Sequence, residues 1–402
     1  MAEEIEFLAW SRTEEGAADL NRSLAAFQAI NPNIKISLAI PAPEMMWADI
    51  IKVVLYQQGA DVGEVGSTYI ETLKGMDSLR PFTAGEVLSF GGDNAFVKSV
   101  LEAGRDSENQ LWAIPWRTDS RVIFYRRDLF AKAGIKEADA FLTPAHMEQT
   151  LQALQASGVE MPLALATASP QALATFTACW VWGAGGDYIN HRGNAVIFNS
   201  PKAQRGFCDY FRLGRYLAPA ARKLDITSSD RLFCEGKAAV TYAGTWFPDA
   251  IEQIGSPMIK ENLGVALPPG VPIVGGTHLV IWKHSIKVSN SLKLIRFLTS
   301  KENLLGYPKS IVSPARLDAL GSNVFSSSVM YQIFTEAIKK GRSAPSLRLW
   351  AVIEDRLGKT LLQIWEKVCS DPDINVGDLI ADEMNSLAAS LGPTFQSKST
   401  RL

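Results

Sequence analysis

The N-terminal part of the chain alternates between short apolar segments and amphipathic segments, and this alternation constrains the fold most strongly. Residues 5–10 form a short apolar run, and residues 34–40 place Ile or Leu at every second position, the period of a β-strand. Between them, apolar residues from 17 to 27 recur at spacings of three and four, which is one face of a helix. A second apolar helical segment, 47–55, precedes another short strand at Asp61. Strand and helix in strict alternation predict an α/β sheet with parallel crossovers.

The same alternation returns after residue 120. Thr143-Pro144 and Ser200-Pro201 each predict the start of a helix, because a hydroxyl side chain caps the first turn and Pro suits its first position. From about residue 325 the pattern is helical, with a long amphipathic run over 347–368. Short strands are expected at 122–125, 161–166, 238–243, 264–267 and 279–282.

Length and charge bound the classes of protein that fit. A single hydrophobic core rarely grows past roughly 250–300 residues, so a chain of 402 residues predicts at least two domains. We find no linker, which predicts that the chain crosses between its domains more than once. Lys and Arg total 40 against 42 Asp and Glu, a balance that argues against a nucleic-acid partner or an anionic membrane. No apolar stretch approaches the ~18–20 residues of a membrane-spanning helix.

Motifs for metal, cofactor or covalent chemistry are missing from the sequence. Gly183-Ala184-Gly185-Gly186 lacks the Lys-Ser/Thr of a phosphate-binding loop, no G-x-S-x-G motif is present, and His278 and His284 have no apparent third ligand. We therefore expect no cofactor and no metal. Carboxylates of the type used in glycoside hydrolysis exist, but their spacing selects no pair (Asp119, Asp187, Glu235). Free thiols are preferred over a disulfide for the four widely spaced cysteines (Cys179, Cys208, Cys234, Cys369).

The ten tryptophans say more about the ligand than the motif search does. Any single one is best interpreted as core, but Trp10 lies at an expected strand end, and Trp112 and Trp116 lie at an expected domain crossing. The other candidates precede the glycine cluster, begin a helix or lie in the long C-terminal helix (Trp180, Trp182, Trp246, Trp350). Sugars present apolar C–H faces that stack on aromatic rings and hydroxyls that need charged or amide partners. A cleft that combines such aromatics with Asp119, Arg117 and Arg12 suits a sugar ligand.

A series of segments, in order along nearly the whole chain, resembles the extracellular solute-binding proteins of bacterial ABC importers. The likeness is to their sugar-binding branch, which includes maltodextrin and trehalose/maltose binders. Ala60 and Tyr69 stand where that family usually has Pro and Trp. The matching segments are Phe7-Leu8-Ala9-Trp10, Phe27 to Ile36 around Asn31-Pro32, Gly59-Ala60-Asp61-Val62, Val65 to Ile70, Ile114 to Arg121, Tyr125 to Gly134, Gly185-Gly186-Asp187, Phe198 to Pro201, Phe233 to Ala239, Gly244-Thr245-Trp246, Val274-Gly275-Gly276 and Phe297 to Ser300.

The resemblance implies a type II periplasmic-binding-protein-like fold, in which two α/β lobes are joined by a hinge of three crossings and hold the ligand in a cleft between them. With crossings near 115–119, 260 and 314, the N-terminal lobe is expected at 1–116 plus 261–313. The C-terminal lobe is then expected at 117–260 plus 314–402.

The same resemblance implies the function and the residues that contact the ligand. It predicts an extracytoplasmic, monomeric substrate-binding subunit that is not an enzyme, closes on a di- or oligosaccharide and delivers it to the permease subunits. Its place is the periplasm, or the cell surface as a lipoprotein, although no signal segment begins this sequence. The positions carried over are Trp10, Arg12, Thr68, Arg117, Asp119, Trp246 and Trp350, with Trp47, Trp182, Asp187, His278 and Arg316 in second rank.

Other functions stay open on the sequence. Within the same fold, Arg12, Arg117, Arg121 and Arg316 suit a charged solute as readily as hydroxyls, and a polyol is a further option. From other classes, a periplasmic hydrolase or lyase, or a sugar-binding sensor that docks a receptor, has the same expected fold.

Overall fold

The computed structural model describes residues 3–11, 14–42, 45–306, 313–371 and 373–396, which form two compact units that we describe one at a time. Unit 1 comprises Met1–Asp119, Val274–Lys339 and Ser346–Arg348. Unit 2 comprises Ser120–Ile273, Lys340–Pro345 and Leu349–Leu402. Among the described residues, no helix combines the length and the apolar character needed to cross a membrane.

Unit 1 is built around the strands expected from the N-terminal alternation. Strand β1 pairs in parallel with β2 and β3, and β3 pairs antiparallel with β8, a strand from late in the chain. The elements are β1 (Glu3–Leu8), α1 (Glu14–Ile30), β2 (Ile34–Ala39), α2 (Met46–Tyr56), β3 (Val62–Gly66), α3 (Ile70–Gly75), α4 (Ala84–Ser89), α5 (Lys98–Ala103), the first part of β4 (Ile114–Arg126), β8 (Val274–Ile281), α13 (Val288–Leu298), α14 (Lys301–Leu305), β9 (Ser313–Pro314), α15 (Leu317–Leu320), α16 (Asn323–Ser326) and α17 (Val329–Lys340).

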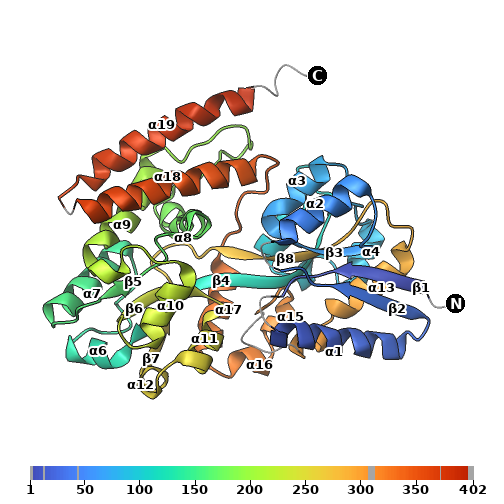
Figure 1. Cartoon of the computed structure of the whole chain (residues 1–402), viewed down its shortest axis with the longest axis horizontal. Helices are drawn as coiled ribbons and strands as arrows, with labels where there is room; N and C mark the ends of the chain where they lie inside the picture. The colour runs from blue at the N-terminus through green and yellow to red at the C-terminus, as the bar shows by residue number, and fades with distance from the viewer. Residues whose placement is uncertain (1–2, 12–13, 43–44, 307–312, 372, 397–402) are drawn as a thin grey trace. The chain divides into compact units, whose positions relative to one another are not determined.

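Both faces of the unit 1 sheet are covered, and each face has its own core. In Figure 1, α1 lies on one side of β1 and β2, and α2 and α3 lie on the other. Phe7 of β1 belongs to the cluster that contains Leu20 and Phe27 of α1, whereas the next residue, Leu8, belongs to the cluster that contains Ile50 of α2. Successive residues of a strand point to opposite faces, so one short strand contributes to both cores.

Unit 2 contains a small mixed sheet and most of the long helices. The second part of β4 pairs antiparallel with β6 and with β7, and β5 pairs in parallel with β6. Its further elements are α6 (Arg127–Lys132), α7 (Pro144–Ala156), β5 (Leu163–Ala164), α8 (Pro170–Gly183), α9 (Pro201–Phe211), α10 (Ile226–Cys234), β6 (Val240–Gly244), α11 (Phe247–Ile254), α12 (Pro257–Glu261), β7 (Leu263–Ala266), α18 (Trp350–Ser370) and α19 (Val376–Gln396).

The long C-terminal helices pack on the rest of unit 2. Figure 1 shows α18 and α19 side by side, and α18 also contacts α8 while α19 contacts α9. Nζ of Lys367 on α18 lies 2.5 Å from Oε1 of Glu383 on α19. The ring of Trp365 on α18 lies 4.9 Å from that of Phe211 on α9, measured between centroids. The amphipathic run expected over 347–368 is therefore a helix whose apolar face contributes to the core of this unit.

Helix starts follow the sequence signals closely. The side chains of Thr143 and Ser200 accept hydrogen bonds from the backbone N–H of His146 and Ala203, and Pro occupies the next position in each case. The two predicted starts are thereby confirmed.

The boundaries of the units differ from the expected ones at four segments, the short ones 117–119 and 346–348, which belong to unit 1, and two longer ones. Residues 261–273 belong to unit 2, because β7 pairs with the second part of β4. Residues 314–339 belong to unit 1, because Ala315 and Ile338 are buried in its core. The periodicity of a segment indicates a strand or a helix, but it does not show which sheet or core the segment joins.

Candidate ligand-binding residues

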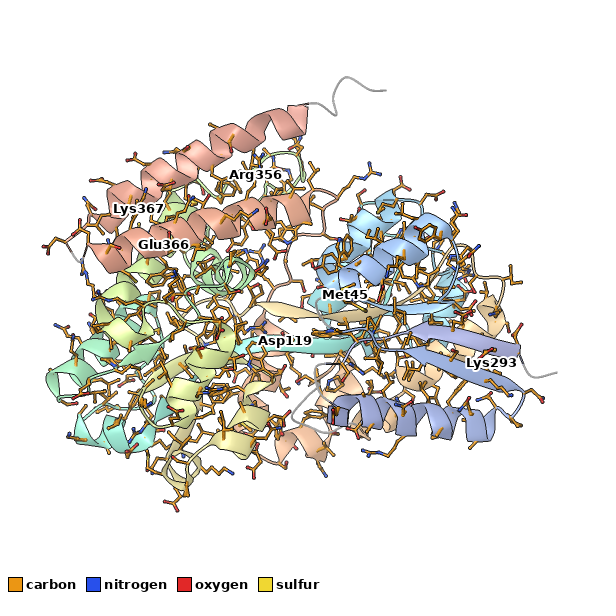
Figure 2. The ribbon with its side chains drawn as sticks, viewed as in Figure 1. Met45, Asp119, Lys293, Arg356, Glu366 and Lys367 are labelled. Carbon is orange, nitrogen blue, oxygen red and sulfur yellow. The ribbon has the colours of Figure 1, made fainter. Side chains whose placement is uncertain are left out.

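Strand β4 carries two of the predicted ligand residues on one of its faces. Trp116 and Thr118 are buried, whereas Arg117 and Asp119 between and after them are half-buried, as the alternation of a strand requires. Figure 2 shows Asp119 on this strand. The segment 114–121, which the resemblance assigned to a hinge, is thus part of a regular strand that continues from unit 1 into unit 2.

A carboxylate that the sequence analysis did not single out lies beside Arg117. Glu64, in the middle of β3, is 1% exposed. Its Oε2 accepts a hydrogen bond of 2.8 Å from the backbone N–H of Trp10, and its Oε1 lies 3.5 Å from Nη1 of Arg117. Nη1 of Arg117 also donates to the carbonyl of Trp10 (3.3 Å), and the guanidinium lies 3.8 Å from the ring centroid of Trp116. We call Trp10, Glu64, Trp116 and Arg117 the Glu64 cluster.

Gly276 is required for the backbone that supports this cluster. Its φ is +150°, and a Cβ at this position would lie 2.2 Å from the carbonyl oxygen of Arg117. Only glycine allows so close an approach. The Val274-Gly275-Gly276 segment therefore has a packing role in β8, next to the strand that carries Arg117.

The first turn after β3 places a further candidate beside an aromatic pair. Thr68 is half-buried in the short 3₁₀ turn Ser67–Tyr69. Tyr69 stacks on Trp47 of α2, with ring centroids 4.6 Å apart, and Trp47 is 37% exposed. Unit 1 thus carries a partly exposed aromatic pair, and Thr68 precedes one of its members in the same turn.

In unit 2, Trp246 is held by a carboxylate and covered by a guanidinium. Its Nε1 donates to Oδ2 of Asp230 on α10 (2.8 Å), and the Arg121 guanidinium lies 4.5 Å from the ring centroid. The ring also folds over Gly244, where a Cβ would lie 2.0 Å from it. This contact explains the glycine of the Gly244-Thr245-Trp246 motif. We call Arg121, Asp230 and Trp246 the Trp246 cluster.

A second group in unit 2 joins two predicted residues and one that was missed. Asp187 accepts from Nε1 of Trp182 (3.1 Å) and from Nη2 of Arg342 (2.8 Å). The Arg342 guanidinium lies 4.8 Å from the Trp182 ring centroid. Trp182 is buried, and Trp350 is only 2% exposed, with its ring 5.7 Å from that of Tyr188. These rings are part of the core of unit 2.

Two other candidates have structural partners within unit 1. His278 on β8 is fully buried, and its Nε2 donates to the carbonyl of Val100 on α5 (2.8 Å). Burial lowers the pKa of His278 to about 4, so the ring is neutral at pH 7. Arg316 donates to the carbonyl of Phe90 (2.8 Å) and to Asp318 (3.0 Å). Both side chains hold neighbouring segments of the fold together.

The structure thus brings together Trp10 with Arg117, and Trp182 with Asp187. Arg12 lies outside the described residues. Among the residues that the sequence analysis missed, Glu64 had a readable signal: an acidic residue inside an apolar strand needs a cation or hydrogen-bond donors when it is buried. Arg342 had no such signal, because its contacts with Asp187 and Trp182 are with residues far away in the sequence.

Two of the three carboxylates considered for hydrolysis, Glu235 and Asp187, form ion pairs. Glu235 lies 2.7 Å from Nζ of Lys237, and a hydrogen bond from Lys237 lowers its pKa. Asp187 is paired with Arg342. A general acid at neutral pH needs the opposite shift, a raised pKa.

Comparisons with known proteins agree with the resemblance. The chain matches the model of the family named bacterial extracellular solute-binding protein over residues 10–304. It is 24% identical over 270 residues to YcjN of Escherichia coli, an ABC transporter periplasmic-binding protein by name, and the match covers 66% of this chain and 60% of YcjN. It is 23% identical over 310 residues to the diacetylchitobiose binding protein DasA of Streptomyces coelicolor, covering 73% and 69%.

Solved structures with a similar fold cover nearly the whole chain. The structure of the sugar-binding protein MalE from Xanthomonas citri matches with a TM-score of 0.86 at 18% identity, over 99% of this chain and 100% of that one. The expected fold class, a type II periplasmic-binding-protein-like architecture of two α/β lobes, is confirmed.

Proposed function

We propose that this chain, which belongs to the family of bacterial extracellular solute-binding proteins, binds a carbohydrate as the substrate-binding subunit of an ABC importer. Family membership over residues 10–304 is the observation that carries the proposal, because this range contains every residue of the Glu64 and Trp246 clusters. The partners are then the permease subunits. The protein acts as a monomer outside the cytoplasmic membrane, in the periplasm or anchored at the cell surface as a lipoprotein.

The chemistry of the two clusters suits a sugar. Aromatic faces contribute apolar burial and stacking, worth ~0.5–1.5 kcal/mol per ring beyond the buried area. Carboxylates and guanidinium groups give charge-assisted hydrogen bonds to hydroxyls, each ~1.5–3 kcal/mol. Asp119, Arg117 and Trp246 are the residues we propose for these contacts.

A thermal-shift screen tests the ligand class. The probes are maltose, N,N′-diacetylchitobiose, tagatose, ribitol and glucose 6-phosphate. A ligand that binds only the native state adds about 2.7 kcal/mol of stability at a hundredfold excess over its Kd. We expect one neutral carbohydrate to raise Tm clearly. No shift with any probe, together with no sugar released from the denatured protein in mass spectrometry, would contradict the proposal.

Two variants then test the residues. Asp119→Ala and Trp246→Ala should each weaken binding of the sugar found in the screen by about tenfold or more, measured by titration calorimetry. Asp77→Ala and Tyr56→Ala are the matched controls, since both side chains are exposed in unit 1. Unchanged affinity in both site variants would remove these residues from the proposed site.

We propose that the protein binds its ligand without cleaving it. Incubation with the bound oligosaccharide should produce no new reducing ends over many hours. Their appearance, and its loss in Asp119→Ala, would favour the hydrolase alternative instead.

A further inference from the structure

We propose that Glu64 sets the charge selectivity of the ligand site: by compensating Arg117 within the protein, it makes the site favour neutral carbohydrates over their anionic counterparts. This inference rests on the proposed function and adds to it a substrate class and a specificity-determining residue that does not itself need to contact the ligand.

Glu64 is buried in β3 and is hydrogen-bonded within unit 1. It lies on β3 between Gly63 and Val65, which are also buried, and the backbone N–H of Trp10 donates to its Oε2 over 2.8 Å. The other oxygen, Oε1, is buried and accepts no hydrogen bond from any residue that the structure describes. Nη1 of Arg117 lies 3.5 Å from Oε1. A buried carboxylate in this position needs that positive charge.

Arg117 is also held by contacts within the protein. Its side chain is 13% exposed, so water screens the pair only weakly. Besides Glu64, it contacts the carbonyl of Trp10 and the ring of Trp116. An arginine without a carboxylate partner is a strong binder of phosphate and carboxylate groups. In this cluster that capacity is already used by the protein.

The consequence differs for neutral and anionic ligands. A hydroxyl can accept a hydrogen bond from an Arg117 N–H that is already polarised, and it brings no charge to Glu64. A ligand carboxylate or phosphate at the same place meets Glu64, and Asp119 lies two residues along the same face of β4. Like charges brought together in a poorly hydrated site disfavour binding strongly. The described groups around Arg117 therefore reject an anion.

The variant Glu64→Gln isolates this effect, because glutamine keeps the shape of glutamate. Its amide oxygen can still accept from the Trp10 N–H, which turns the amide NH₂ toward the guanidinium 3.5 Å away. Arg117 then keeps its charge and loses the negative charge of Glu64 beside it. We expect the ratio of affinities for the neutral sugar and for its acid, made by oxidising the reducing end, to fall by about tenfold or more. The wild-type protein should favour the neutral form.

Glu86→Gln is the matched control. Glu86 pairs with Arg80 in the same unit (2.7 Å), so this variant removes the same charge from the molecule without touching Arg117. A ratio that falls equally in both variants, or stays unchanged in Glu64→Gln, would overturn the inference. So would a wild-type preference for the acid. If no carbohydrate binds the wild type at all, the proposed function fails. The role of Glu64 can then still be tested by a measurement that needs no sugar.

That measurement uses sulfate as the probe. Millimolar sulfate should raise the Tm of Glu64→Gln more than that of the wild type or Glu86→Gln at equal ionic strength, because it replaces the lost carboxylate. If Glu64→Gln does not fold, the double variant Glu64→Gln/Arg117→Met should fold, since the defect comes from an uncompensated guanidinium. Equal sulfate shifts in all three proteins, or a double variant as unstable as Glu64→Gln, would show that Glu64 does not compensate Arg117.

Discussion

Two buried polar side chains of unit 1, Glu64 and His278, are stabilised in opposite ways. Glu64 faces the guanidinium of Arg117 and a backbone N–H, so its environment supplies the opposite charge. His278 has a backbone carbonyl as its partner, and burial then favours the neutral ring. The two residues lie on neighbouring strands, β3 and β8. What each contributes depends on the groups around it and not on the residue type.

Stability at mildly acidic pH should report on His278. Because its pKa is about 4 in the folded protein and 6.5 is usual, the unfolded chain binds a proton in this interval that the folded chain does not. The contribution of the neutral His278 to the free energy of unfolding is therefore complete above pH 6.5. It is lost as the pH falls toward 4, at up to about 1.4 kcal/mol per pH unit.

Urea unfolding between pH 7.5 and 4.5 checks this. His278→Gln can keep a donor for the Val100 carbonyl and should show a shallower loss of stability over this range than the wild type. His191→Gln, at an exposed position, is the control and should follow the wild type. Parallel curves for His278→Gln and the wild type would contradict a buried neutral histidine.

At the scale of elements, close contact between helices α8 and α9 explains two glycines of unit 2. Gly206 on α9 faces α8, and a Cβ there would lie 2.5 Å from the carbonyl oxygen of Trp180 and 2.5 Å from Cα of Val181. Gly186, just after α8, faces Ala203 of α9 in the same way. The glycine-rich segment therefore lets two helices approach each other, and this packing role agrees with the absence of a phosphate-loop motif.

Gly206→Ala should therefore be clearly destabilising. The methyl group meets backbone atoms that cannot rotate away, and overpacking of this kind costs about 1–3 kcal/mol. Gly85→Ala on α4 is the matched control, because nothing lies within 4 Å of a Cβ there. It should leave stability unchanged or raise it by up to about 1 kcal/mol. Chemical denaturation of both variants measures the difference, and equal effects would refute the close-contact explanation.

On the scale of the whole molecule, no disulfide contributes to stability, because the four cysteines are free. Cys179 and Cys234 are buried, and burial raises the pKa of each thiol to about 12. Burial also raises the pKa of Cys208 and of Cys369, which are half-buried. Since the thiolate is the reactive form, all four should resist oxidation in the folded protein.

Reductant should accordingly leave Tm unchanged. A thiol-reactive chromophore at pH 8 should label Cys179 and Cys234 only very slowly in the native protein, while all four cysteines react at once in guanidinium chloride. Peptide mapping of the labelled chain identifies the sites. A fall in Tm with reductant, or fewer than four reactive thiols after unfolding, would reveal a disulfide.

Much of the fold was readable from local patterns. The caps at Thr143 and Ser200 and the strand period of residues 34–40 depend on neighbours a few residues away, so sequence alone identifies them. The family resemblance extended this to the class of fold, and it selected Arg117, Asp119 and Trp246. The partners of Arg117 and Trp246, which are Glu64 and Asp230, were missed. Glu64 is recognisable as an acidic residue in an apolar strand, but the spacing of residues in one segment does not indicate which distant side chain it pairs with.

Local periodicity and capping are properties of short segments, and they determined the strands, the helices and the alternation that predicts two α/β lobes. Tertiary structure alone decided that residues 261–273 join unit 2 and 314–339 join unit 1, and that His278 and Trp350 are buried. It also decided that Arg117 meets Glu64. These outcomes depend on which distant segments pack against each other. Hydrophobic burial is non-directional, so an apolar pattern in one segment does not specify which other segment it packs against.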